Sequence, residues 1–213
     1  MNRRATRLDD AGLAIAVADL AARDVDLAGI VTRHGPPPLW DRAPGFATLL
    51  HIVLEQQVSL ASAQAAFDRL RAAADPLTPA GFLELSDAEL LAIGFSRQKA
   101  RYGRALANAV VDRSLDLDGL DELEDDAVHE ALQAIPGIGP WTSTIYLLMV
   151  LGRPDVWPVG DIALAESIGQ VKRLGRRPDA VEMARLGDAW RPWRSVAARL
   201  FWHDYLARRG RSG

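Results

Sequence analysis

Apolar residues recur along this chain at the three- and four-residue spacing of amphipathic helices. The clearest stripe lies in the segment 46–57, at Phe46, Leu49, Leu50, Val53 and Leu54. Strict alternation of apolar and polar residues, which indicates half-buried strands, does not recur along the sequence. The pattern predicts an all-α protein of about ten helices with short connections.

Several of these helices have recognisable ends. Ser59 is placed to cap the helix that follows the segment 46–57. Ser86 and Glu89 have the spacing of a capping box at the start of a later helix. Gly94 follows that helix, as a residue that can adopt the left-handed conformation of a helix end.

Composition narrows the class of protein. The chain has 213 residues, 49% of them apolar, which is enough to form a packed core. It contains no cysteine, which excludes disulfides and a thiolate-held iron–sulfur cluster.

The formal net charge of −3 hides an uneven distribution, because acidic residues gather between Asp116 and Glu130 while basic residues gather elsewhere. Each basic cluster alone is better explained as a solvated helix face, but together they predict a basic surface for nucleic acid. The clusters are Arg97, Lys99, Arg101 and Arg104; Lys172, Arg173, Arg176 and Arg177; Arg191, Arg194 and Arg199; and Arg208, Arg209 and Arg211.

The N-terminus lacks the pattern of a secretion signal. Residues 1–7 are basic, but Asp19 interrupts the apolar stretch 11–20, and no small-residue cleavage site follows. No run approaches the ~20 apolar residues of a membrane-spanning helix. We expect a soluble, cytoplasmic protein without membrane contact.

The most informative stretch, residues 132–162, reads LQAIPGIGPWTSTIYLLMVLGRPDVWPVGDI. A helix ends before Pro136, and Gly137-Ile138-Gly139 follows as a tight turn in which Ile138 points inward. A second apolar helix begins near Pro140, which suits a first helical turn. This arrangement brings backbone N–H groups and a helix N-terminus to one spot, a geometry that binds phosphate, although PGIG alone is more often an ordinary helical hairpin.

Other segments of the chain favour a functional interpretation of this turn over an ordinary helical hairpin. The second helix leads into a glycine- and proline-rich loop that ends in PVGD, with Asp161 as its last residue. Together with PGIGPWT, three segments carry a resemblance: QQVS at 56–59, GFSRQKA at 94–100 and WRPWRS at 190–195. The chain resembles the helix-hairpin-helix DNA glycosylase superfamily, most closely its alkylpurine (3-methyladenine) branch. The resemblance covers residues 10–208 and is to the compact form, without the N-terminal α+β domain of longer bacterial members.

The resemblance implies a two-lobed helix-hairpin-helix DNA glycosylase fold. A helical lobe of residues 46–154 would carry the hairpin, residues 1–45 and 155–213 would form the second lobe, and the active-site cleft would lie between them. The implied partner is double-stranded DNA with alkylated bases, bound by a monomer that would be nucleoid-associated in a bacterium. No cofactor is implied beyond Na⁺ or K⁺ held by the backbone carbonyls of Gln133, Ile135 and Ile138.

Asp161 is the candidate catalytic residue. Hydrolysis of an N-glycosidic bond passes through an oxocarbenium-like transition state, and a fixed carboxylate can stabilise that charge and place a water. Asp161 is also placed to cap the helix that follows it, and both roles can hold together. Bifunctional members of the superfamily carry a nucleophilic lysine where this chain has Trp141. The resemblance therefore implies a type II DNA-3-methyladenine glycosylase that uses water and has no lyase activity.

The target base must leave the duplex to be cut. By family position Trp141 and Trp202 would stack on the electron-poor alkylated purine, and Tyr146 is a weaker candidate. His203 follows Trp202 and is a further candidate near the cleft, while Trp190 and Trp193 are expected in the core.

The resemblance also implies DNA contacts. Gly137, Ile138 and Gly139 would bind the phosphate backbone, with Thr142 and Lys99 nearby. Gln57, with Gln56 beside it, would be the wedge that enters the duplex, where many relatives have an apolar residue. A polar turn between two helices explains both glutamines equally well.

Rival interpretations stay open from the sequence. They are a glycosylase for another lesion, such as uracil or ethenoadenine, and a non-catalytic helix-hairpin-helix DNA-binding module. A helical bundle for protein interaction is more distant. The presence of Asp161 together with Trp141 and Trp202 favours an enzyme.

Overall fold

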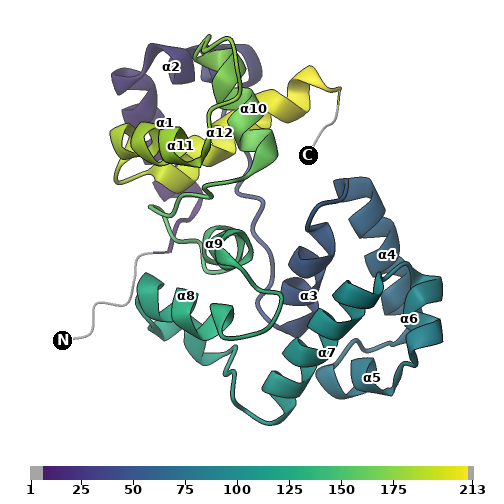
Figure 1. Ribbon diagram of the computed structural model, residues 1–213. Helices are drawn as coiled ribbons and strands as arrows, with labels where there is room; N and C mark the ends of the chain where they lie inside the picture. The colour runs from purple at the N-terminus through teal and green to yellow at the C-terminus, as the bar shows by residue number, and fades with distance from the viewer. Residues whose placement is uncertain (1–6, 211–213) are drawn as a thin grey trace. The chain divides into compact units, whose positions relative to one another are not determined.

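The computed structural model describes residues 7–210, and this part of the chain is helical throughout (Figure 1). Between these residues there are twelve α-helices, two short 3₁₀ helices and no strand, which confirms the all-α prediction. Residues 1–6 and 211–213 lie outside the described part, and with them most of the basic N-terminus and Arg211. No helix between residues 7 and 210 is long and apolar enough to cross a membrane.

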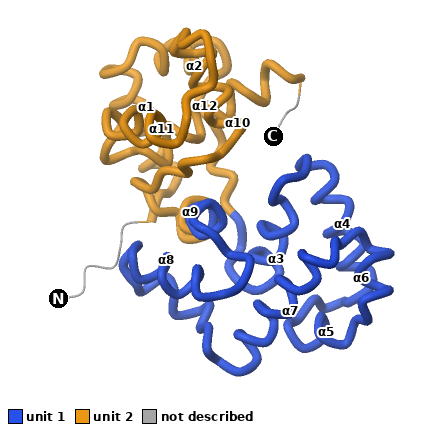
Figure 2. The backbone as a smooth tube through the Cα atoms, viewed as in Figure 1, with its two compact units in different colours: residues 1–5, 42–146 blue, residues 6–41, 147–213 orange. Residues whose placement is uncertain are grey.

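The chain divides into two compact units (Figure 2). Unit 1 comprises residues 1–5 and 42–146, and unit 2 comprises residues 6–41 and 147–213. The division falls within α9 (Pro140–Met149), whereas the sequence analysis expects lobe boundaries at 46 and 154. The cleft expected between the lobes stays a prediction.

Unit 1 is built from short helices whose ends follow the local signals in the sequence. The capping box of Ser86 and Glu89 is present, Ser59 caps its helix, and Gly94 has φ +111°. The helices are α3 (Phe46–Glu55), α4 (Leu60–Ala73), α5 (Pro79–Glu84), α6 (Asp87–Ile93), α7 (Arg97–Val111), η1 (Gly119–Glu122), α8 (Asp125–Gln133) and the first part of α9.

The core of unit 1 lies where α3, α5 and α7 pack on one another. Phe82 of α5 is fully buried, with its ring 5.9 Å from that of Phe46 and 5.8 Å from that of Phe95. Gly103 of α7 makes room for this ring, because a Cβ at Gly103 would lie 2.6 Å from Phe82 Cζ. The aromatic contact brings α7 close to α3 and so sets the position of the corner that follows α3.

Unit 2 is organised around its last helix, α12 (Arg194–Arg208), which packs on α1, α2 and α10. Trp190 lies in its core as expected, 5.2 Å from the ring of Trp157 and 5.0 Å from that of Phe201. The other helices are α1 (Asp10–Arg23), α2 (Val25–His34), α10 (Ile162–Val171), α11 (Ala180–Gly187) and η2 (Asp188–Trp190).

Arg199 is a buried residue that links three segments of unit 2. Its guanidinium donates to the carbonyls of Leu39 (2.7 Å) and Leu148 (2.9 Å), and burial lowers its pKa to about 10. The arginine therefore joins α12 to the segment after α2 and to the end of α9, and it does not belong to the basic surface in which the sequence analysis placed it.

Candidate active site

The hairpin forms where the sequence predicts it. α8 ends at Gln133, α9 begins at Pro140, and the turn comprises residues 134–139. Ile138 is buried and its N–H donates to the carbonyl of Ile135 at 3.0 Å. Gly137 has φ +92°, and a Cβ there would lie 2.1 Å from Cγ of Tyr102. Only glycine fits this position, because both the backbone conformation and the neighbouring ring exclude a side chain.

Gly139 differs from Gly137. A Cβ at Gly139 would meet no heavy atom within 4 Å, and its φ lies outside the left-handed region. The packing of the protein therefore does not require glycine at this position. A glycine that the fold does not need is consistent with close approach of a ligand to the backbone.

A small hydrogen-bond network braces the two hairpin helices. Ser143 of α9 is fully buried, and its Oγ lies 2.7 Å from Nδ1 of His129 and accepts from Nε2 of Gln133 at 3.2 Å. His129 and its partner Ser143 lie on opposite sides of the turn, so the sequence does not predict this contact. The network fixes the angle at which α8 meets α9.

The predicted wedge lies at the corner between α3 and α4. Gln57 is exposed and has φ +58°, a conformation that costs a residue with a side chain about 1–2 kcal/mol. Such strain at an exposed position is frequent at functional sites. Gln56 is half-buried, and its Nε2 donates to the carbonyl of Gly137 (2.9 Å) and to Oγ1 of Thr142 (2.8 Å). The two glutamines therefore have different environments: Gln57 faces solvent and Gln56 faces the hairpin.

Lys99 and Thr142, two predicted DNA contacts, each form a hydrogen bond within unit 1. Lys99 Nζ donates to the carbonyl of Leu54 at 2.5 Å, and burial lowers the pKa of this amine. Thr142 is 1% exposed, so its hydroxyl serves Gln56 and does not reach a bound duplex. The burial of Thr142 contradicts the predicted contact of its side chain with DNA, whereas the contact predicted for Lys99 stays a prediction.

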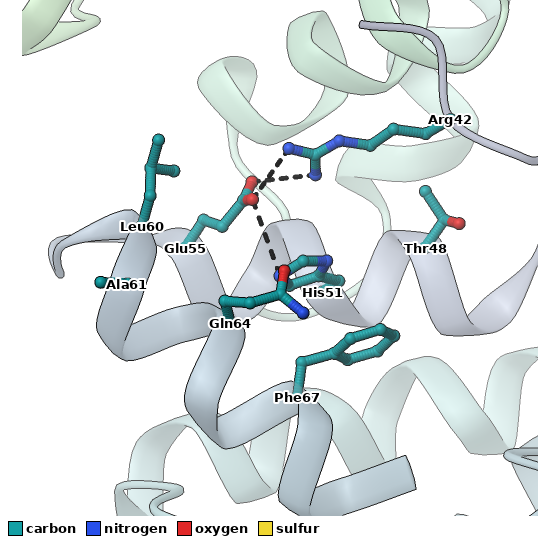
Figure 3. Close-up of a pocket in the computed structure, with 8 residues that line it drawn as sticks. All are labelled: Arg42, Thr48, His51, Glu55, Leu60, Ala61, Gln64 and Phe67. Carbon is teal, nitrogen blue, oxygen red and sulfur yellow. Dashed lines mark hydrogen bonds and ion pairs between the residues drawn. The ribbon is translucent and has the colours of Figure 1, made fainter. Parts of the chain in front are cut away.

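A partly buried ion pair precedes the wedge corner. Arg42 makes two hydrogen bonds to the carboxylate of Glu55, the last residue of α3, at 3.1 and 2.8 Å (Figure 3). His51 stacks on Phe67 with ring centroids 4.2 Å apart, and burial lowers its pKa. These side chains line an open pocket of about 500 Å³ on α3 and α4. The ion pair fixes the last turn of α3, and hence the start of the corner.

In unit 2, Asp161 is both a helix cap and a held carboxylate. Its Oδ1 accepts from the N–H of Leu164 at 2.8 Å, which confirms the predicted cap of α10. The same oxygen accepts from Nε1 of Trp202 on α12 at 3.1 Å. These two hydrogen bonds, from different helices, fix the orientation of the carboxylate. The partners are 41 residues apart, so the sequence does not predict this bond.

The surroundings of Asp161 combine a rigid loop with exposed apolar groups. Trp157 anchors the loop by donating from Nε1 to the carbonyl of Met183 at 2.9 Å, and Gly160 takes φ +88°. Val159 is 36% exposed and Ile162 is 65% exposed, so apolar side chains stand on both sides of the half-buried carboxylate.

The four residues predicted in or near the pocket differ in burial and in their partners. Trp141 is half-buried near the start of α9, and Trp202 is 8% exposed and engaged with Asp161. Tyr146 is fully buried, and burial raises the pKa of its phenol, so this side chain belongs to the core and not to an open pocket wall. His203 lies between α12 and α2, with Nε2 3.0 Å from the carbonyl of His34, so the structure gives it a packing role.

Within the described part of the chain, seven residues of the basic clusters form ion pairs within their own unit, and the basic surface expected from the sequence stays a prediction. Lys172 bridges Asp24 and Asp26 at 2.7 and 3.0 Å, and Arg194 lies 2.9 Å from Asp155. The other ion pairs are Arg104–Asp87, Arg176–Glu182, Arg191–Asp155, Arg208–Asp204 and Arg209–Glu166. These ion pairs lower the net positive charge that the clusters present.

The hairpin also offers carbonyls to a cation. Gln133 is the last residue of α8, and carbonyls at a helix C-terminus lack intrahelical partners and carry partial negative charge. The carbonyl of Ile135 accepts one hydrogen bond, from Ile138, and retains a second lone pair. Neutral carbonyl oxygens of this kind fit a hard monovalent cation better than a transition metal.

Known proteins are similar to this chain over most of its length. A model of the HhH-GPD superfamily base excision DNA repair protein matches residues 50–192. A putative DNA-3-methyladenine glycosylase of Bacillus subtilis, YfjP, is 27% identical over 84% of this chain and 65% of its own length. The chain thus spans less than two thirds of that relative.

Solved structures share the fold. A DNA-3-methyladenine glycosidase of Bacillus halodurans is 30% identical, with a TM-score of 0.72 over 89% of this chain and 88% of that one. The 3-methyladenine DNA glycosylase Mag1 of Schizosaccharomyces pombe, solved in complex with abasic DNA, is 24% identical. Its TM-score is 0.82, over 88% of this chain and 95% of that one.

Proposed function

Since the chain belongs to the HhH-GPD superfamily of base excision DNA repair proteins, we propose that it is a monofunctional DNA glycosylase for alkylated purines. Its substrate would be double-stranded DNA with bases of the 3-methyladenine or 7-methylguanine type. The observation that carries the proposal is the carboxylate of Asp161, held by the helix end and by the indole of Trp202. The names of the relatives, DNA-3-methyladenine glycosylases, support the substrate class.

The proposed reaction follows from that carboxylate. The bond between the sugar C1′ and the base nitrogen breaks, and its electron pair leaves with the base, which an N-alkylated purine accepts readily because it is electron-poor. Asp161 stabilises the positive charge that develops on the sugar. Water adds to C1′ and loses a proton, which leaves an abasic site in an intact strand.

Trp141 supports the absence of lyase activity. A lyase of this superfamily needs a lysine amine to form a Schiff base with the sugar, and this chain has an indole at that position. The indole would instead stack on the flipped base, because an electron-rich ring attracts an electron-poor or cationic purine.

The hairpin would hold the DNA. Backbone N–H groups around Gly137 and Gly139 would bind a phosphate, and the exposed Gln57 would fill the space that the flipped base leaves. The carbonyls of Gln133, Ile135 and Ile138 would hold Na⁺ or K⁺, which supplies positive charge next to the bound phosphate.

The test is a panel of duplexes that carry single lesions. Release of 3-methyladenine or 7-methylguanine without strand cleavage, and without a covalent adduct on borohydride treatment, is the expected result. Release of uracil or ethenoadenine alone would assign another substrate. An adduct would overturn the monofunctional assignment, and binding to abasic-analogue DNA without release of any base would leave a DNA-binding module.

A further inference from the structure

Gln56 joins two parts of unit 1 that the proposed function uses for different tasks. Its Nε2 donates to the carbonyl of Gly137 at 2.9 Å and to Oγ1 of Thr142 at 2.8 Å. A primary amide nitrogen carries two hydrogens, so both are engaged with the hairpin. The partners lie 81 and 86 residues away in sequence, and Gln57 directly follows Gln56. One side chain thus ties the wedge corner to the phosphate-binding turn.

The corner is held at its start by two further contacts. The carbonyl of Leu54 accepts from Lys99 of α7 at 2.5 Å, and Glu55 accepts two hydrogen bonds from Arg42. Three consecutive residues, 54 to 56, are therefore each fixed by a different segment of unit 1. Of these three residues, Gln56 is the one that binds the hairpin.

We propose that Gln56 is a positioning residue that fixes the distance between the hairpin and the wedge residue Gln57. The inference rests on the proposed function for the roles of these two surfaces. When the hairpin binds the backbone, the corner is then already placed to enter the duplex, so backbone binding and base displacement proceed as one step. Gln56 acts through Gly137 and Thr142 and does not touch the reacting atoms.

The variants follow from the burial of the partners. Gln56→Met keeps the length of the side chain and removes both donated hydrogen bonds. Thr142→Val removes one acceptor from a residue that is 1% exposed and so cannot contact DNA. Thr144→Val is the matched control: this threonine is 7% exposed on the same helix, and its hydroxyl donates to the carbonyl of Pro140 at 2.7 Å.

Three measurements separate the roles: affinity for an undamaged duplex, fluorescence of 2-aminopurine next to an abasic analogue, and single-turnover base release. Gln56→Met and Thr142→Val should keep duplex affinity within about twofold and lower base unstacking and base release about tenfold. The double variant should be no worse than Gln56→Met alone, because the hydrogen bond that Thr142→Val removes is one of the two that Gln56→Met already removes. Thr142→Ser should lose less than Thr142→Val, and Thr144→Val should stay within about twofold of wild type.

Other outcomes overturn the inference. A defect in Gln56→Met with none in Thr142→Val would mean that Gln56 contacts DNA directly. Additive defects, or a parallel loss of duplex affinity that follows melting temperature, would mean separate or merely structural roles. If the wild type releases no base, the proposed function fails; the fluorescence of the abasic-analogue duplex still decides whether Gln56 couples hairpin and wedge.

Discussion

Replacement of Gly137 with alanine tests the geometry of the hairpin, because two separate costs meet at this position. A residue with a Cβ at φ +92° costs about 1–2 kcal/mol in backbone strain. The new Cβ would lie 2.1 Å from Tyr102 Cγ, so the ring or the turn must shift, which costs about 1–3 kcal/mol. Gly137→Ala should therefore lower the free energy of unfolding by about 2–5 kcal/mol.

Two other glycines separate these costs. Gly175 has φ +70° but no heavy atom within 4 Å of an added Cβ, so Gly175→Ala measures the backbone term alone. Gly139 has neither a left-handed φ nor a neighbour within 4 Å, so Gly139→Ala should be close to neutral in stability. Urea denaturation of the three variants should rank Gly137→Ala as the least stable, then Gly175→Ala, then Gly139→Ala.

The glycine variants also test the binding of duplex DNA. Gly139→Ala should weaken binding to duplex DNA about tenfold while stability is kept, because its methyl group points into space that a phosphate would need. Tyr102→Ala in the Gly137→Ala background should recover the part of the stability loss that comes from the clash. If Gly137→Ala is no less stable than Gly175→Ala, the ring of Tyr102 does not confine the turn and the reasoning fails.

Three further predictions concern single side chains. Trp202→Phe keeps an aromatic ring but removes the donor to Asp161, so single-turnover base release should fall about tenfold at a nearly unchanged melting temperature. An unchanged rate would mean that this hydrogen bond does not contribute to base release. Burial lowers the folded-state pKa of His51, so the unfolded chain binds the proton first and wild type loses stability as pH falls below about 6.5. His51→Gln should lose less stability over that range in urea denaturation, and an equal loss would contradict this. Gln57→Gly removes the strain of a left-handed φ, so the free energy of unfolding of the variant should equal that of wild type or exceed it by up to ~1 kcal/mol. The unstacking of 2-aminopurine should fall in this variant. An unchanged fluorescence signal would exclude Gln57 as the wedge.

The features that the sequence predicted correctly are encoded locally. The capping box of Ser86 and Glu89, the turn at Gly137 and the cap at Asp161 each depend on residues within four positions of one another. Helical spacing likewise identified the all-α class, because each helix carries its own apolar stripe.

The features that the sequence did not predict depend on distant partners. Lys99 reaches Leu54 across 45 residues, and Gln56 reaches the hairpin across more than 80, so spacing along the chain could not predict either hydrogen bond. Ion pairs within the basic clusters were not predicted for the same reason, since Lys172 meets Asp24 across 148 residues. Charge counted along a sequence does not show which charges the fold pairs.

The most direct test of the account is base release by Asp161→Asn on duplex DNA that contains 7-methylguanine. Asparagine retains an oxygen that can accept from Leu164 and Trp202, so α10 should stay capped and the melting temperature should be close to that of wild type. The negative charge is lost, and with it the stabilisation of the sugar cation, so single-turnover release should fall at least about 100-fold. Equal release by Asp161→Asn and wild type would remove this carboxylate from the reaction and contradict the central claim.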